Sequence, residues 1–151
     1  MEILNYDDNK HRSQVVNIWK SVFNYKDSRN DPEFLIDCKL SVNDNLFFVA
    51  VSQNQVVGTI MAGYDGHRGW IYSLAVIAEN RNEHIGTKLL VHAENELKKL
   101  GCPKIKLQIL KSNETVKEFY LKNNYQIEEL ICMGKEIKEN IKTKRKQNKT
   151  N

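Results

Sequence analysis

The sequence lacks any long apolar run. No stretch approaches the roughly 20 consecutive apolar residues that a membrane-spanning helix needs. Its first ten residues, MEILNYDDNK, are acidic and polar, which is unlike a signal peptide. We therefore expect no membrane segment and take a cytoplasmic protein as the default. A chain of 151 residues, of which 40% are hydrophobic, fits one globular domain.

Cysteine pairs and metal-ligand spacings are also missing. The three cysteines, Cys38, Cys102 and Cys132, are odd in number and far apart, and no C-x-x-C pair occurs. The histidines show no spacing such as H-E-x-x-H. They are His11, His67, His84 and His92. We expect reduced, buried thiols and no metal site.

Excess charge is confined to one end of the chain. The net charge is +4, but residues 138–151 carry six Lys or Arg residues and one Glu, a net +5, which leaves −1 for residues 1–137. A near-neutral body argues against a nucleic-acid-binding face on the fold itself. The sequence therefore predicts a domain over residues 1–137 and a basic, disordered tail over residues 138–151.

Hydrophobic periodicity predicts strands and helices in the order β-α-α-β-β-β-α-β-α-β-β. This order indicates an α+β (three-layer α/β) fold, with a mixed, mostly antiparallel sheet and helices on both faces. The expected strands are 2–6, 45–52, 55–64, 70–78, 104–110 and one or two within 125–137, and the expected helices are 10–23, 32–42, 85–100 and 114–124.

Turn and capping residues support these boundaries. Asp31 before Pro32 is typical of a helix start, because the side chain caps free N–H groups and proline suits the first turn. Gln53 and Asn54 separate two β-rich runs, which is a hairpin signal. Asn113 is placed to cap the helix that follows it.

One loop has the position of a phosphate-binding turn. Residues 79–90, ENRNEHIGTKLL, run from a loop into a helix, where free N–H groups point at an incoming anion. Such loops are usually rich in glycine, yet Gly86 is the only glycine here. A polar loop before an amphipathic helix is common, so this feature alone does not establish phosphate binding.

The order of elements and the run YSLAVIAENRNEHIGTKLL resemble the Gcn5-related N-acetyltransferases (GNAT family), which transfer an acetyl group from acetyl-CoA to an amine. The resemblance extends to about residue 138. The runs NDPEFLIDCKL, VVGTIMAGYDGHRG and MGKEIKEN are similar to the YpeA-type branch. The resemblance implies acetyl-CoA (coenzyme A) as cofactor.

The family's phosphate loop reads Arg or Gln, two residues, Gly, one residue, then Gly or Ala. Arg81 and Gly86 match its ends, whereas His84 stands at the central glycine and Asn82 replaces a frequent extra one. A side chain forced to a left-handed backbone costs about 1–2 kcal/mol, and less for Asn or His. Main-chain N–H donors do not depend on side chains, so the resemblance still implies cofactor binding by this loop. The loop residues concerned are Arg81, Asn82, Glu83, His84, Ile85, Gly86 and Thr87.

In the family, the strand before this loop splays from its neighbour, and the pantetheine arm lies against it like an added strand. The resemblance places Leu74 and Val76 there as main-chain ligands, while their side chains are equally well explained as core. It also assigns coenzyme A binding to Asn113, for which helix capping is an alternative explanation.

Two tyrosines are the catalytic candidates. By resemblance, Tyr120 in the F-Y-x-x-x-x-Y pattern lies beside the cofactor sulfur and protonates the departing thiolate, although a buried core tyrosine is an equal alternative. We expect Tyr72 to contact the substrate or an ordered water through which the proton leaves. Some relatives place a carboxylate or histidine base at positions that match Trp70, Tyr72 or Gln108, none of which is an obvious base here.

The turn GYDGHRG offers one further base. Its Asp-Gly pair is explained by a tight hairpin, whereas that explanation leaves His67 without a role, so His67 is a further candidate for the base.

The sequence thus predicts an N-acetyltransferase that acts on a primary amine, small molecule or protein, by direct attack in a ternary complex. Two alternatives remain: a degenerate acyl-CoA-binding module, and a nucleic-acid-associated protein that acts through the basic tail. The expected partner is an amine acceptor substrate, and no membrane partner is expected. A homodimer through an exposed edge strand is compatible with the predicted sheet.

Overall fold

The central hairpin forms where the turn residues predict it. In the computed structural model, which describes residues 1–23 and 26–137, β2 (Phe47–Ser52) and β3 (Gln55–Tyr64) pair antiparallel. Gln53 and Asn54 connect them with φ values of 50° and 62°. A two-residue hairpin turn of this twist needs both residues at positive φ.

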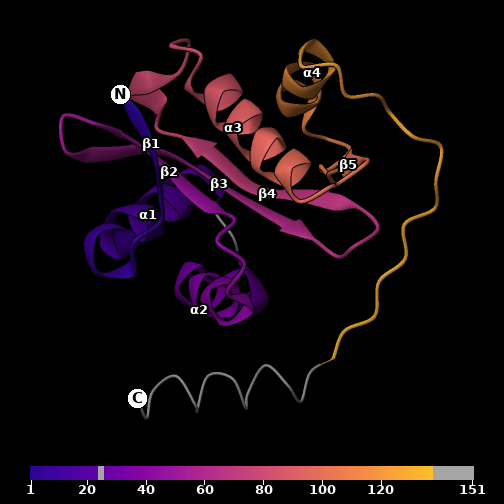
Figure 1. Ribbon diagram of the computed structural model, residues 1–151, viewed down its shortest axis with the longest axis horizontal. Coiled ribbons are helices and arrows are strands. Elements are labelled where there is room, and N and C mark those ends of the chain that lie inside the picture. Colours follow the sequence, from indigo (N-terminus) through magenta and orange to yellow (C-terminus); the bar gives the residue numbers. More distant parts are fainter. Residues whose placement is uncertain (24–25, 138–151) are drawn as a thin grey trace. The chain divides into compact units, whose positions relative to one another are not determined.

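Five strands form one sheet in the order β1-β2-β3-β4-β5 (Figure 1). The outer strands are β1 (Glu2–Asn5) and β5 (Ile105–Lys106), and β4 (Gly69–Val76) lies beside β3. All pairs are antiparallel except β4 with β5, which is parallel. The predicted mixed, mostly antiparallel sheet is confirmed.

Helices cover both faces of this sheet. α1 (Asp8–Phe23) and α2 (Pro32–Val42) lie on one side of it and α3 (Ile85–Lys99) on the other, as Figure 1 shows. The Asp31 side chain accepts the Phe34 N–H at 3.2 Å, which confirms the predicted start of α2. A short 3₁₀ turn, η1 (Ser28–Asn30), precedes that cap.

Apolar stripes of the helices meet the sheet and form the core. Trp19 of α1 is fully buried and stacks on Phe47 with ring centroids 5.8 Å apart. On the opposite face, a side chain added at Gly58 would collide with Leu89 and Ile85 of α3. Glycine at this position therefore lets α3 approach β3 closely.

The chain divides into two compact units, residues 1–107 and 108–151. Within the described part of the second unit, α4 (Glu114–Lys122) is the only helix, and Asn113 caps it by accepting the Val116 N–H at 3.3 Å. The predicted cap is confirmed.

Two strand predictions were wrong in extent. The strand expected over 104–110 forms only at β5, and residues 125–137 contain no helix or strand, so the one or two closing strands are not formed. Strand-forming residues need a partner ladder to satisfy their backbone groups. Five apolar side chains of this segment remain largely exposed instead: Ile127, Leu130, Ile131, Met133 and Ile137.

The tail predicted over residues 138–151 lies outside the described residues. Across the described part of the chain, no helix combines the length and apolar character needed to cross a bilayer.

Candidate active site

β4 is distorted in its middle by a β-bulge. Met61 of β3 pairs with Tyr72, but Thr59 pairs with Ala75, so Ile60 faces two residues of β4 instead of one. One of them, Ser73, has a φ of 50°, the left-handed region that non-glycine residues seldom adopt. Bulges of this kind redirect a strand and occur frequently beside active sites.

The bulge changes which peptide groups face the outer edge of β4. Before it, the Gly69 N–H faces outward and donates to the Lys104 carbonyl at 2.9 Å. Beyond it, the Ile77 N–H points inward to the Val57 carbonyl of the β3 side at 3.0 Å. Because successive residues alternate along a strand, the main-chain groups of Leu74 and Val76 face away from β3.

That outer edge is largely uncovered by β5. The ladder between the two strands joins only Gly69 with Ile105 and Trp70 with Lys106. In the described chain, therefore, the edge at Leu74 and Val76 carries no ladder to β5. An extended ligand could add to it as a strand would.

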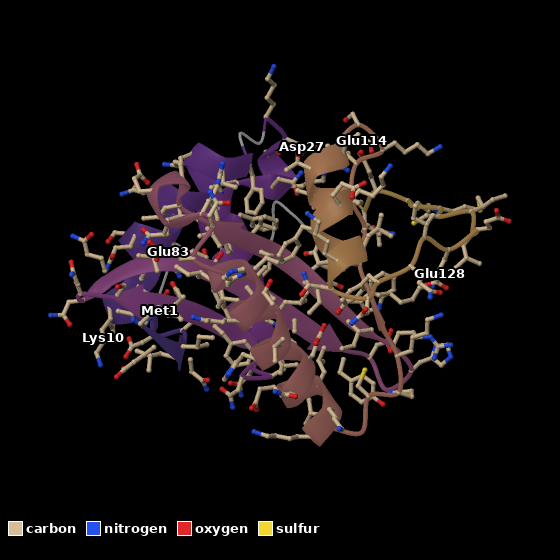
Figure 2. All side chains as sticks on the ribbon, turned by 90° about the horizontal axis from the view of Figure 1, so that it is seen from above. Met1, Lys10, Asp27, Glu83, Glu114 and Glu128 are labelled. Atoms are coloured by element: carbon tan, nitrogen blue, oxygen red, sulfur yellow. The ribbon has the colours of Figure 1, made fainter. Side chains whose placement is uncertain are left out.

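The loop after β4 has the backbone of a glycine-rich turn without the glycines. After η2 (Ala78–Asn80), Asn82 and His84 have φ values of 72° and 58°. His84 stands at the central glycine of the family pattern and Asn82 at a frequent extra one, and Asn and His tolerate this conformation better than other side chains. Arg81 to His84 are exposed; Glu83 of this loop is labelled in Figure 2.

α3 begins directly after this loop without a side-chain cap. His84 is its N-cap residue and makes no side-chain capping hydrogen bond. The first N–H groups of a helix have no partner within the helix. Those of Ile85, Gly86 and Thr87, together with the positive end of the helix dipole, form a suitable place for an anion.

Arg81 connects the loop to the strand edge. Its Nε donates to the carbonyl of Val76 at 3.3 Å. The guanidinium is exposed, so its charge is available to an anion near the loop as well as to this carbonyl.

Tyr72 and the GYDGHRG turn lie before the bulge. Tyr72 is 47% exposed, and its partial burial, followed by the negative charge of Asp65, raises the pKa of its phenol. The Asp65 carboxylate accepts the N–H groups of His67 and Arg68, both at 2.7 Å, which lowers its pKa. These two hydrogen bonds let the Asp65 carboxylate stabilise the turn. The His67 side chain, in contrast, is exposed.

The second unit carries the remaining candidates, Asn113 and Tyr120. Tyr120 is 7% exposed and packs edge-on between Phe119 and Tyr125, with ring centroids 5.1 and 5.4 Å away. This burial raises the pKa of its phenol well above the ordinary value of 10. Tyr120 is therefore a neutral phenol, a donor of protons and not an acceptor, at physiological pH.

Three residues at the bulge escaped sequence reasoning: Trp19, Thr59 and Ser73. They come from three elements, and no role was assigned to them from the sequence. One signal was available, since a threonine stands in the apolar run VVGTIMA of a central strand, where a hydroxyl needs a partner.

In the described chain, no group of three or more His, Cys, Asp or Glu side chains is arranged to hold a metal ion. Cys38, Cys102 and Cys132 form no disulfides with one another; Cys38 and Cys102 are partly buried, and Cys132 is exposed, so the expectation of a buried thiol was wrong for Cys132. Cys132 accepts a hydrogen bond from Gln108 at 2.6 Å.

Comparison with known proteins gives a consistent family. The family model described as "Acetyltransferase (GNAT) family" matches residues 12–125. Acetyltransferase ECA0875 of Pectobacterium atrosepticum is 40% identical over 108 residues, which cover 72% of this chain and 77% of that protein.

Solved structures share the fold at low sequence identity. PaiA N-acetyltransferase from Thermoplasma acidophilum, in complex with coenzyme A, aligns with a TM-score of 0.74 and 21% identity, over 86% of this chain and 92% of that one. The aminoglycoside antibiotic 6'-N-acetyltransferase from Acinetobacter haemolyticus aligns with a TM-score of 0.71 and 16% identity, over 91% and 99%.

Proposed function

The chain belongs to the GNAT acetyltransferase family and is an acyl-CoA-dependent N-acetyltransferase, and from this premise we propose that it acetylates a primary amine by direct attack in a ternary complex. The observation that carries the proposal is the combination, on consecutive segments, of a bulged strand edge and an uncapped helix N-terminus. The first suits an extended amide-containing arm and the second suits a diphosphate.

Residues of the loop and strand would hold coenzyme A. Main-chain N–H groups from Asn82 to Thr87 bind the diphosphate, and the Arg81 guanidinium adds a positive charge. The peptide groups of Leu74 and Val76 bind the pantetheine arm along the edge of β4. Asn113, besides capping α4, offers an amide to the cofactor. Bound acetyl-CoA supplies an acetyl group activated as a thioester.

Tyr120 serves as the general acid of this proposal. Because burial keeps its phenol protonated, it can donate a hydrogen bond, and then a proton, to a leaving sulfur as negative charge develops there. Its raised pKa makes complete transfer to a thiolate of pKa about 8.5 uphill. The benefit therefore comes from stabilising developing charge in the transition state.

Tyr72 faces the amine in this proposal. An alkyl amine of pKa about 10 is mostly protonated at neutral pH and must lose a proton before it attacks. The pKa of Tyr72 is raised, so it is a poor base at neutral pH. We assign it to contacting the amine or an ordered water through which the proton leaves.

The acceptor belongs to the class of primary amines, and relatives with this fold include an aminoglycoside acetyltransferase. We suggest a panel of an aminoglycoside, a polyamine, a lysine peptide and a peptide with a free N-terminus. Thiol release from acetyl-CoA is the readout, with and without residues 138–151.

Calorimetry with acetyl-CoA provides the separate test of binding. Binding with turnover of at least one amine supports the proposal. Binding without turnover of any amine favours the acyl-CoA-binding module. If the calorimetric titration shows no saturable binding up to millimolar acetyl-CoA, the proposed cofactor site is refuted.

A further inference from the structure

A buried threonine supports the bulge from the sheet side. Thr59 of β3 is 0% exposed. Its hydroxyl donates to the main-chain carbonyl of Ser73 at 2.9 Å and accepts the indole N–H of Trp19 at 2.9 Å. The chain Trp19–Thr59–Ser73 thus runs from α1 through β3 to the bulge in β4.

This arrangement resolves the polar requirements of the bulge. A bulge interrupts the strand ladder and leaves backbone groups without their regular partners, and a buried carbonyl without a partner is destabilising. The Thr59 hydroxyl supplies the missing donor. The indole N–H of Trp19 donates to the oxygen of the Thr59 hydroxyl. The hydrogen of this hydroxyl is therefore directed to the carbonyl of Ser73.

The choice of threonine is otherwise difficult to explain. Thr59 and His11 are the two buried polar residues among the described ones, and valine has the same branched shape without a polar atom to bury. Valine would fit the core contacts equally well. What it cannot provide is a donor to the bulge.

The bulge in turn sets which peptide groups reach the outer edge of β4. Residues that face this edge have odd numbers before the bulge, as Gly69 does, and even numbers beyond it, as Val76 does. If β4 straightened into a regular strand, the outward groups beyond Ser73 would belong to different residues. Leu74 and Val76 would then turn toward β3.

We propose that Thr59 and Trp19 are positioning residues, which hold the Ser73 bulge so that Leu74 and Val76 present their main chain to the acyl-CoA arm. Neither side chain contacts cofactor or amine, and both act through the backbone of β4. The inference rests on the proposed function for its purpose, but the relay itself can be tested without turnover.

The decisive variants are Thr59→Val, which removes only the hydroxyl, and Thr59→Ser, which retains it. For Thr59→Val we expect affinity for acetyl-CoA and kcat/KM for the cofactor to fall by about tenfold or more. For Thr59→Ser both should stay within about twofold to threefold of wild type. Trp19→Phe removes the upstream donor and serves as the second variant if Thr59→Val does not fold; it should show the same direction of change.

A stability control separates positioning from general loosening. Ile36→Val in α2 alters the same core, in which Ile36 is 0% exposed and clusters with Trp19, but it removes none of the relay's hydrogen-bonding groups. It should lower the melting temperature while leaving affinity for acetyl-CoA unchanged. If Thr59→Val also lowers only the melting temperature, the positioning role is overturned.

Amide hydrogen exchange over residues 69–77 gives a readout that does not depend on the enzyme reaction. Faster exchange there in Thr59→Val, and not in Thr59→Ser or Ile36→Val, supports the relay, and equal exchange in all three overturns it. Should wild-type protein fail to bind acetyl-CoA, the proposed function falls, and the exchange result still decides whether the relay holds the bulge.

Discussion

The Nε of Arg81 donates a hydrogen bond to the carbonyl oxygen of Val76 at 3.3 Å. One exposed cation therefore links the loop before α3 to the strand edge that we assign to the acyl-CoA arm. Both ends of this contact are accessible, and an exposed hydrogen bond of this kind contributes little to stability because water competes for it.

Arg81→Gln should weaken binding of acetyl-CoA by about twofold to fivefold, because a surface cation attracts a diphosphate by a fraction of a kcal/mol to about 1 kcal/mol. The difference from wild type should shrink in high salt. Calorimetry at two ionic strengths measures both effects. Lys98→Gln is the matched control, since it removes a cation in the last turn of α3, about 20 Å along the helix from its start at Ile85. An equal loss in both variants would mean that only net charge matters.

His84→Gly should preserve cofactor binding. His84 has a φ of 58°, and glycine adopts this conformation without the cost of up to about 1–2 kcal/mol borne by a side chain. Because the folded loop already has this φ, the saving falls on folding, so we expect a higher melting temperature and an affinity for acetyl-CoA preserved within about twofold. His84→Val, with a branched side chain at the same φ, should lower the melting temperature and the affinity. Weaker binding by His84→Gly would instead show that the imidazole contacts the ligand.

Tyr120→Phe should lower kcat by about 100-fold while the dissociation constant for acetyl-CoA stays within about twofold, since a general acid acts in the transition state. Tyr125→Phe alters the ring that packs against it, 5.4 Å between centroids, and should keep most of the activity. Steady-state kinetics and calorimetry separate the two effects. Equal kcat in Tyr120→Phe and wild type would remove Tyr120 from the mechanism.

The pH–rate profile adds a check on Tyr120. Its ordinary pKa is 10 and burial raises it, so the phenol keeps its proton as pH rises through 9 and 10. Deprotonation of Tyr120 should therefore cause no decline of kcat between pH 9 and pH 10. A decline that vanishes in Tyr120→Phe would contradict the neutral buried phenol.

His11 should make the folded state sensitive to mild acid. Its Nδ1 accepts the Asp7 N–H at 3.0 Å, and burial lowers its pKa, with Lys10 adding to the effect and Asp7 opposing it. The unfolded chain then binds more protons than the folded one below about pH 6.5. Stability is complete above that pH and is lost as pH falls through the lowered pKa of the folded state.

The measurement is the melting temperature between pH 7 and pH 5. His11→Gln, whose side-chain oxygen can still accept the Asp7 N–H, should flatten the dependence on pH. His67→Gln, at an exposed histidine, should leave it unchanged. The pKa of Asp8 is also lowered. A carboxyl with a lowered pKa changes the stability only below about pH 4, which is outside this window. An unchanged slope in His11→Gln would exclude His11 as its source.

The sequence by itself determined the features that depend on neighbours along the chain. Asp31 caps α2, and Gln53 with Asn54 turns the hairpin, because each of these hydrogen bonds or backbone conformations involves residues a few positions apart. The loop at Asn82 and His84 is of the same kind. Its left-handed residues stand where the family pattern has glycine.

Only the tertiary structure decided the features that require a distant partner. Nothing local marks Ser73 as a bulge, since the donor to its carbonyl comes from Thr59 and that hydroxyl is oriented by Trp19, 40 positions away from Thr59. The closing segment 125–137 shows the same limit, because strand-forming residues become a strand only beside a ladder that accepts them. Turns and caps depend on hydrogen bonds and backbone conformations of residues close together in the sequence. Pairing between strands depends on partner strands that are distant in the sequence and that only the folded chain brings together.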